Sequence, residues 1–312
     1  MEMIKLKKSR NEKLDTNPTP PYNTSRLERM IIEGKVLERI IKDNNLLPIN
    51  FLEKGVKKAK SVAFILLPDG GATGFLIGKD ILLTNNHVLE NEEVAKNAKI
   101  LFNYQINIDG TNAPVDEYIC DPDQFFYTNK DLDYSIVKIK KSLNGESIDA
   151  KLTTTFESNS TPGEHWGVIP LIEKAEVIIG NRGNIIQHPA MRRKEIACHD
   201  NILEKIEGNF LLYTTDTEPG SSGSPVFNDK WELLALHHSS GEEQNGQWLN
   251  NEGIIISHII NDLIKTFNND ERGKEILFEL GISGIEECTA SGSVTVDSGG
   301  RASGSGSITC RF

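Results

Sequence analysis

Three short segments of the chain carry a histidine, an aspartate and a serine in settings that suit acyl transfer. A serine hydroxyl becomes a nucleophile when an imidazole takes its proton and a carboxylate holds that imidazole in one tautomer. Backbone N–H groups must also face the negative oxygen that develops on the substrate. The chain offers a candidate for each part, in the order His87, Asp133, Ser222.

The nucleophile candidate is Ser222, in the run Glu-Pro-Gly-Ser-Ser-Gly-Ser-Pro at 218–225. Gly220 and Gly223 permit a tight, exposed turn that residues with side chains would resist. Such a turn can aim the N–H groups of Gly220 and Ser222 at one point, which predicts an oxyanion hole. Taken alone, a Gly/Ser run is more typical of a plain flexible loop.

The base and the carboxylate each lie at the end of an expected strand. His87 follows the apolar run 81–84, and Asp133 directly precedes the alternating segment 135–139. A lone histidine in such a place is more often structural, and Asp131 competes for the carboxylate role. We favour Asp133 because the strand begins immediately after it, so that its carboxylate can be buried against an imidazole N–H.

Short apolar runs separated by turn residues fill the middle of the chain, which predicts an antiparallel β-sandwich or barrel. The expected strands are 62–67, 74–77, 81–84, 100–102, 135–139, 177–179, 211–214, 224–227, 233–237 and 253–256. Helical spacing of apolar residues predicts helices at 25–45, 52–60, 257–267 and 270–280. The Ser- and Gly-rich tail 289–312 is expected to be a flexible extension, with a small hairpin as the alternative.

Composition narrows the class of protein. The 312 residues carry a formal net charge of −11, which disfavours binding to nucleic acid or an anionic membrane. No apolar run approaches the ~18 residues of a membrane helix, and the start has no apolar core of a signal peptide, so a cytoplasmic location is expected.

The cysteines and histidines give no metal signature. Cys120 and Cys198 are far apart and no CxxC pair occurs, so the sequence predicts no metal and no cofactor. Cys288 and Cys310 flank the tail and could pair in an oxidising setting, although reduced thiols are the simpler expectation. The neighbouring His237 and His238 should point to opposite faces of a strand, which makes a poor ligand pair.

Three motifs resemble the active-site blocks of the trypsin-like (chymotrypsin-fold) serine peptidases, in particular the bacterial V8-like branch of glutamyl endopeptidases. They are Leu-Thr-Asn-Asn-His-Val, Leu-Asp-Tyr-Ser-Ile-Val and Pro-Gly-Ser-Ser-Gly-Ser-Pro-Val-Phe. The resemblance covers 62–267 and implies an all-β fold of two antiparallel six-stranded β-barrels with a C-terminal helix. It also implies that His87 is the general base, Asp133 its orienting group and Ser222 the nucleophile. The expected domains are an N-terminal helical extension at 1–60, the peptidase domain at 61–268, and a helix and tail at 269–312.

Two positions depart from the digestive members of that family. Those members have a bridged cysteine beside the catalytic histidine, where this chain has Val88. They also have an aspartate just before the serine, which pairs with a freed N-terminal amine on activation. Ser221 occupies that place here and cannot form the ion pair, so activation by this route is not expected.

The resemblance also marks a substrate pocket. His237 matches the histidine that receives the substrate carboxylate in the glutamyl-specific branch, and Thr217 and Ser240 resemble its hydroxyl partners, which implies cleavage after Glu or Asp. Asp216 falls where trypsin keeps the aspartate that binds Lys or Arg, which implies a basic residue instead. If Asp216 instead pairs with His237, the pocket would be neutral and would select another residue or a very narrow set of substrates, and charge complementarity leaves all three alternatives open.

The expected function is therefore a cofactor-free serine endopeptidase acting on protein or peptide substrates. An idle binding protein on the same fold and an esterase are the alternatives. A regulatory partner is expected at the N-terminal helices or the tail. The layout, a helical stretch before such a domain, resembles bacterial effectors of antiviral defence.

Overall fold

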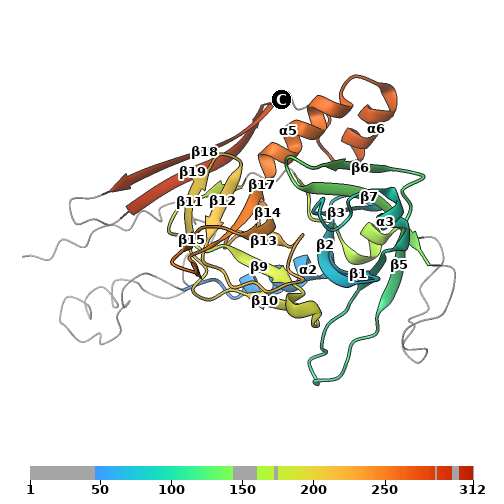
Figure 1. Ribbon diagram of the computed structural model, residues 1–312, viewed down its shortest axis with the longest axis horizontal. Helices are drawn as coiled ribbons and strands as arrows, with labels where there is room; N and C mark the ends of the chain where they lie inside the picture. The colour runs from blue at the N-terminus through green and yellow to red at the C-terminus, as the bar shows by residue number, and fades with distance from the viewer. Residues whose placement is uncertain (1–45, 143–159, 172–174, 285–286, 297–301, 312) are drawn as a thin grey trace, which may run out of the picture. The chain divides into compact units, whose positions relative to one another are not determined.

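The computed structural model describes residues 46–142, 160–171, 175–284, 287–296 and 302–311 (Figure 1). The chain divides into a unit of residues 1–46 and a compact unit, Leu47–Phe312, that holds every element named below. The helix expected at 25–45 lies outside the described residues. Among the residues described, every helix is too short or too polar to cross a bilayer.

The first sheet is a closed six-stranded barrel with one extra strand. Its order is β3-β2-β1-β4-β5-β7-β6, and a further pairing of β3 with β7 closes the ring. Its core consists of inward apolar side chains such as Ile65, Leu82, Ile100 and Val137, all fully buried. The strands are β1 (Val62–Leu67), β2 (Gly70–Leu76), β3 (Ile81–Thr84), β4 (Lys99–Phe102), β5 (Asp116–Cys120), β6 (Phe126–Asn129) and β7 (Tyr134–Lys141).

The second sheet is a half-barrel in the order β10-β9-β13-β14-β17-β12-β11. Main-chain bonds near its two ends, from the Gly183 N–H to the Asn201 carbonyl and from the Leu203 N–H to the Asn181 carbonyl, draw those ends together. The strands are β9 (Asn184–Gln187), β10 (Glu195–Ala197), β11 (Leu203–Glu207), β12 (Phe210–Tyr213), β13 (Pro225–Phe227), β14 (Leu233–Ser240) and β17 (Asn251–Ile255). The expected all-β fold is confirmed, with the second barrel more open than the first. A small hairpin, β15 (Glu243–Gln244) and β16 (Gln247–Trp248), lies beyond β14.

Helices cover the ends of the sheets. The helices α2 (Asn50–Lys60), α5 (Ile256–Phe267) and α6 (Glu271–Glu279) confirm the predictions for 52–60, 257–267 and 270–280. The apolar face of α5 packs into the core through residues such as Ile259, Ile260 and Leu263. Two short helices, α3 (Glu92–Asn97) and α4 (Pro162–Trp166), were not expected from the sequence. Each begins at a side-chain cap, on Asn91 and Thr161 respectively.

Helix α2 belongs to the compact unit. The indole N–H of Trp231 donates to the carbonyl of Phe51 at 2.8 Å, and the ammonium of Lys194 donates to the carbonyl of Ala59 at 2.6 Å. The compact unit therefore begins before α2, at Leu47, and the domain boundaries at 61 and 268 stay predictions.

The tail forms a hairpin instead of the expected flexible extension. The strands β18 (Glu287–Val296) and β19 (Ala302–Arg311) pair antiparallel, and β8 (Glu176–Val177) adds a third strand. The Ser/Gly content concealed β-forming residues such as Val294, Val296 and Ile308. Cys288 and Cys310 lie directly opposite each other in this register, and reduced thiols stay the prediction for both.

Candidate active site

The pairing of β3 with β7 brings His87 and Asp133 together. Thr84, the last residue of β3, is in register with Ser135 of β7, so the residues just beyond these strand ends lie at the same edge of the barrel. His87 Nδ1 lies 2.8 Å from Asp133 Oδ2. The His87 backbone N–H donates to the other carboxylate oxygen, Oδ1, at 2.9 Å. The His87 imidazole is 46% exposed, whereas the Asp133 carboxylate that it contacts is only 14% exposed. The ring is therefore accessible from solvent, and its partner is largely buried.

The backbone around Asp133 explains why this aspartate, and not Asp131, meets the imidazole. Asp133 has a φ of 43°, a left-handed conformation that aspartate tolerates better than most residues. The side-chain amide of Asn85 donates to the Asp133 carbonyl at 3.0 Å and holds this turn. Asp131 is exposed. The preference for Asp133 over Asp131 therefore agrees with the geometry.

The carboxylate fixes the tautomer of His87. Burial alone would raise the pKa of Asp133, but hydrogen bonds from His238 and His87 outweigh burial and hold that pKa well below its usual range. An ionised carboxylate only accepts hydrogen bonds, so His87 Nδ1 must carry the proton. In the neutral imidazole, His87 Nε2 therefore carries the lone pair, which is the arrangement a general base needs.

Residues 220–223 form the turn that carries the nucleophile candidate Ser222, here called the nucleophile turn. Main-chain hydrogen bonds hold this turn against both sheets. The Thr73 N–H of β2 donates to the Ser222 carbonyl at 2.9 Å, and the Gly223 N–H donates to the His237 carbonyl of β14 at 3.0 Å. Thr84 Oγ1 in turn donates to the Thr73 carbonyl at 2.8 Å. The backbone of Ser222 is thus linked through Thr73 to the end of β3, three residues before His87.

Gly220 and Gly223 are required by this turn. Gly223 has a φ of 85°, and a Cβ there would collide with the Thr73 carbonyl and the Thr84 hydroxyl. Gly220 has a φ of 102°, and a Cβ there would lie 2.6 Å from the His188 carbonyl oxygen. Both positions combine a backbone conformation that disfavours side chains with a close approach of neighbouring backbone.

The N–H groups expected to form the oxyanion hole are available. Among the described residues, neither the Gly220 N–H nor the Ser222 N–H has a hydrogen-bond acceptor. The Thr73 hydroxyl donates to the Gly220 carbonyl at 2.9 Å and accepts the His188 N–H at 3.1 Å, which fixes the peptide that follows Gly220. Two unpaired donors on a turn held in this way fit the role predicted for them.

The expected pocket residues occupy different environments. His237 is only 3% exposed, and its Nδ1 lies 2.8 Å from the Tyr213 hydroxyl. Burial lowers the pKa of His237 to about 3, so this imidazole is neutral at physiological pH. Asp216 and Ser240 are exposed and Thr217 is half-buried, and the Asp216 carbonyl accepts the side-chain amide of Gln187 at 3.0 Å.

Two further charged residues at this site were missed by the sequence reasoning. His238 Nδ1 lies 2.6 Å from Asp133 Oδ2, and His238 Nε2 lies 3.2 Å from Glu252 Oε1. His87, Asp133 and His238 together are a set of groups that could in principle hold a metal ion. However, ligands on one tetrahedral Zn²⁺ are separated by roughly 3.3 Å or more at ordinary bond lengths. The spacings from Asp133 Oδ2, 2.6 and 2.8 Å, are those of direct hydrogen bonds.

Comparison with known families identifies the family to which the chain belongs. The Trypsin-like peptidase domain family matches residues 72–236, which include His87, Asp133 and Ser222. The chain belongs to this family. The resemblance drawn from the three motifs is therefore confirmed at the level of the family.

Individual relatives of the trypsin-like chain are longer proteins. Protein y4fB of Sinorhizobium fredii is 31% identical over 277 residues, which cover 74% of this chain and 40% of the relative. Secreted RxLR effector protein 73 of Plasmopara viticola is 29% identical over 187 residues, which cover 54% of this chain and 41% of that protein. The chain thus spans about two fifths of the length of these curated relatives.

A solved structure of a Glu endopeptidase in complex with MPD is also similar. It has 18% sequence identity and a TM-score of 0.46, and the match covers 64% of this chain and 85% of that chain.

The two positions that depart from the digestive trypsin-like peptidases are both internal. Ser221 is fully buried, and its hydroxyl accepts the Glu218 N–H at 3.2 Å. A neutral hydrogen bond thus occupies the place where those peptidases form their activation ion pair. Val88 is 4% exposed and packs in the core of the first barrel, where an apolar side chain replaces the bridged cysteine.

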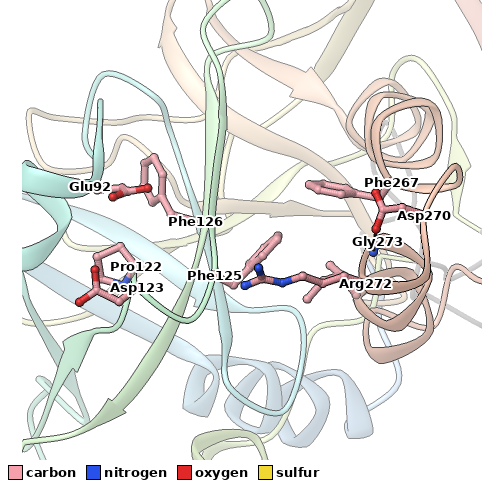
Figure 2. A pocket seen from close by; sticks show the side chains of 10 residues that line it. Glu92, Pro122, Asp123, Phe125, Phe126, Phe267, Asp270, Arg272 and Gly273 are labelled. Atoms are coloured by element: carbon pink, nitrogen blue, oxygen red, sulfur yellow. Dashed lines mark hydrogen bonds between the residues drawn. The ribbon is translucent and has the colours of Figure 1, made fainter.

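A separate cavity of the trypsin-like domain lies away from these residues (Figure 2). It has a volume of about 370 Å³ and is lined by Phe125 and Phe126 of the first barrel and by Phe267, Asp270 and Arg272 around α5 and α6. The Arg272 guanidinium donates to the Gln124 carbonyl at 2.8 Å across it. None of the expected site residues lines this cavity.

We expect Gly223→Ala to remove the reactivity of Ser222 while leaving a folded protein. The added methyl group must displace Thr73 or Thr84, both of which hold the nucleophile turn. Labelling by a fluorophosphonate should fall by at least about 100-fold, the scale on which a lost oxyanion donor acts. Gly208→Ala is the matched control, because Gly208 also has a positive φ, of 58°, but has open space around its Cβ position. Equal labelling of the two variants would contradict this account of the turn.

Proposed function

We propose that this chain is a serine endopeptidase that hydrolyses peptide bonds through an acyl-enzyme on Ser222. The proposal rests on two features of the site taken together. One is an imidazole whose tautomer is fixed by a carboxylate, and the other is a pair of backbone N–H groups that can donate to a substrate oxygen. His87 Nδ1 is held by Asp133 at 2.8 Å, and the N–H groups of Gly220 and Ser222 lack acceptors among the described residues. Peptide-bond hydrolysis by serine needs both features.

The proposed reaction proceeds in two halves. In the first, His87 Nε2 takes the Ser222 hydroxyl proton while Oγ attacks the substrate carbonyl carbon, and the resulting oxyanion accepts the N–H groups of Gly220 and Ser222. The carbon–nitrogen bond then breaks as the imidazolium returns its proton to the leaving amine. In the second half, water attacks the acyl carbon while His87 takes a proton from that water. The bond between the acyl carbon and Ser222 Oγ then breaks, and His87 returns the proton to Oγ.

The rival functions make different demands on these residues. A binding protein that had lost its chemistry would have no need of a strained position, whereas Asp133, a residue with a side chain, is held at a φ of 43° at the site. Strained backbone that is held by specific hydrogen bonds is typical of functional sites. An esterase would use the same residues, so the substrate class is decided by turnover and not by geometry.

We further propose that the residue before the scissile bond is acidic. Because His237 is neutral, it supplies no positive charge, and an acidic side chain would be received through hydrogen bonds from groups such as Thr217 and Ser240. Asp216 is the opposing feature, since its exposed carboxylate would repel an acidic side chain and attract Lys or Arg. The charge of Asp216 is therefore the quantity to vary in an experiment.

We also propose that the peptidase works inside a bacterial cell as a regulated effector of antiviral defence. Two observations support this proposal. The chain divides into a unit of residues 1–46 and the compact unit Leu47–Phe312, and it matches only part of its longer relatives. A regulatory protein that binds residues 1–46 or the β18–β19 hairpin would restrain a hazardous activity.

The first prediction concerns the nucleophile. The purified protein should react with a fluorophosphonate probe and cleave a denatured protein, and Ser222→Ala or His87→Ala should lower turnover by at least about 10⁴-fold. Ser224→Ala is the matched control, because its buried hydroxyl has no partner among the described residues and its removal should leave activity unchanged. Full labelling of Ser222→Ala would remove the proposed role. Cleavage of esters without peptides would favour the esterase.

The second prediction concerns the substrate. In a panel of reporter peptides that differ only before the scissile bond, kcat/KM should be at least about tenfold higher for Glu or Asp than for Lys or Arg. Asp216→Asn should raise kcat/KM for Glu and leave it unchanged for Gln, because only the charge repulsion is removed. Cleavage only after Lys or Arg, lost in Asp216→Asn, would establish the basic alternative.

The third prediction concerns regulation. Deletion of residues 1–46 should leave the intrinsic kcat/KM of the compact unit within about twofold and abolish binding of the regulatory protein, measured by co-purification from cells under phage infection. An unchanged set of bound proteins after this deletion and after deletion of 287–312 would dismiss the proposal.

A further inference from the structure

A β-bulge in β14 directs His238 toward the carboxylate of Asp133. The pairing of β14 with β17 shifts by one residue between His237 and Ser239, which lie opposite Gly253 and Glu252 respectively. The extra residue of such an irregularity is re-aimed relative to its neighbours. His237 is consequently buried against Tyr213, while His238 reaches across to the first barrel.

His238 lies between two carboxylates. Its Nδ1 is 2.6 Å from Asp133 Oδ2 and its Nε2 is 3.2 Å from Glu252 Oε1. Both ring nitrogens of His238 thus face carboxylate oxygens, which accept hydrogen bonds and cannot donate them. This arrangement favours the doubly protonated, cationic form of the imidazole.

The other described contacts of His238 are with aromatic rings. The ring stacks on Phe210 of β12, with centroids 5.7 Å apart. His237, from its own strand, is neutral, and the His87 ring lies edge-on at 6.3 Å. Burial would lower the pKa of His238, but the Asp133 and Glu252 carboxylates outweigh burial and raise it above its ordinary value.

We propose that His238, as an imidazolium, is a positioning residue that holds the Asp133 carboxylate and sets the pH range in which His87 acts as a base. This inference rests on the proposed peptidase function and adds a residue to it. Asp133 Oδ2 receives both His87 Nδ1 and His238 Nδ1, so His238 fixes the oxygen that orients the base.

The charge of His238 has a second consequence. A lone Asp133 carboxylate would favour the protonated form of His87, and a protonated His87 cannot accept the Ser222 proton. The nearby cation offsets part of this field and so keeps His87 available as a base toward lower pH. At the 6.3 Å separation of the two rings, removing one unit charge should move the titration of His87 upward by about one pH unit after screening by solvent.

Three substitutions separate the hydrogen bond from the charge. His238→Gln keeps a donor for Asp133 and removes the charge. His238→Ala removes both, and Glu252→Gln removes a negative charge instead of a positive one. His199→Gln is the control, because His199 is exposed and is not among the contacts of this site.

The test uses the full-length protein and two independent readouts. Histidine titration followed by ¹⁵N NMR needs no substrate, and the pH profile of kcat/KM reports on catalysis. In His238→Gln, the His87 midpoint and the acidic limb of the profile should both move upward by about one pH unit. The plateau at high pH should stay close to that of the unmodified protein. In His238→Ala the plateau should fall by about tenfold, because the carboxylate is no longer held. Glu252→Gln and His199→Gln should not move the midpoint upward.

The two proposals fail separately. A neutral His238 at pH 7, or a His87 midpoint that is the same in His238→Gln and the unmodified protein, would overturn the role of His238 even if the enzyme is active. An unmodified protein that shows the expected NMR shifts but neither hydrolyses peptides nor reacts with the fluorophosphonate would overturn the peptidase function alone. Equal losses in both His238 variants at every pH would show a merely structural residue.

Discussion

The backbone contact between Thr73 and the nucleophile turn is the constraint on which the candidate site depends. The base and its carboxylate belong to the first barrel, whereas Ser222 belongs to the second sheet, so no single sheet contains the chemistry. Thr73 donates from its N–H to Ser222 and from its hydroxyl to Gly220, and it accepts Thr84 on its carbonyl. One residue of β2 therefore holds the turn that carries the Ser222 hydroxyl and the N–H groups of Gly220 and Ser222.

Electrostatics at the site follow from burying one carboxylate. A buried charge is costly unless hydrogen bonds satisfy it. Asp133 receives a backbone N–H and two imidazole N–H groups, which is enough to keep it ionised. Its ionisation in turn fixes the tautomer of His87. The cluster is thus organised around the Asp133 anion, which determines which ring nitrogen of His87 faces it as a donor.

Much of this arrangement was predictable from local sequence. Apolar runs bounded by turn residues placed β1 and β3 correctly, and the motifs around His87, Asp133 and Ser222 pointed to the family. The strands β5, β6, β9, β10 and β11 and the small β15–β16 hairpin were missed because their polar and apolar residues do not alternate cleanly, and tertiary pairing decides their conformation. The tail was misjudged because composition was given more weight than its few β-forming residues.

The role of His238 could not be read from strand periodicity. Strict alternation places His237 and His238 on opposite faces, which is correct, but it does not say what lies across the cleft from each. That depends on the bulge opposite Glu252 and on the approach of the first barrel. Likewise, no local pattern shows that His237 is neutral, because its environment comes from Tyr213, which lies 24 residues away in the chain.

Helix α2 changes where this module can be joined to other sequences. Its two ends are hydrogen-bonded to Trp231 and Lys194, which lie just before β14 and β10 of the second sheet, so it cannot be separated from the fold as a linker. A fusion made at the start of β1 would remove α2, which is part of the compact unit. A fusion made before residue 47 would keep α2 in place. The portable unit of this protein therefore begins with a helix and not with a strand of the first barrel.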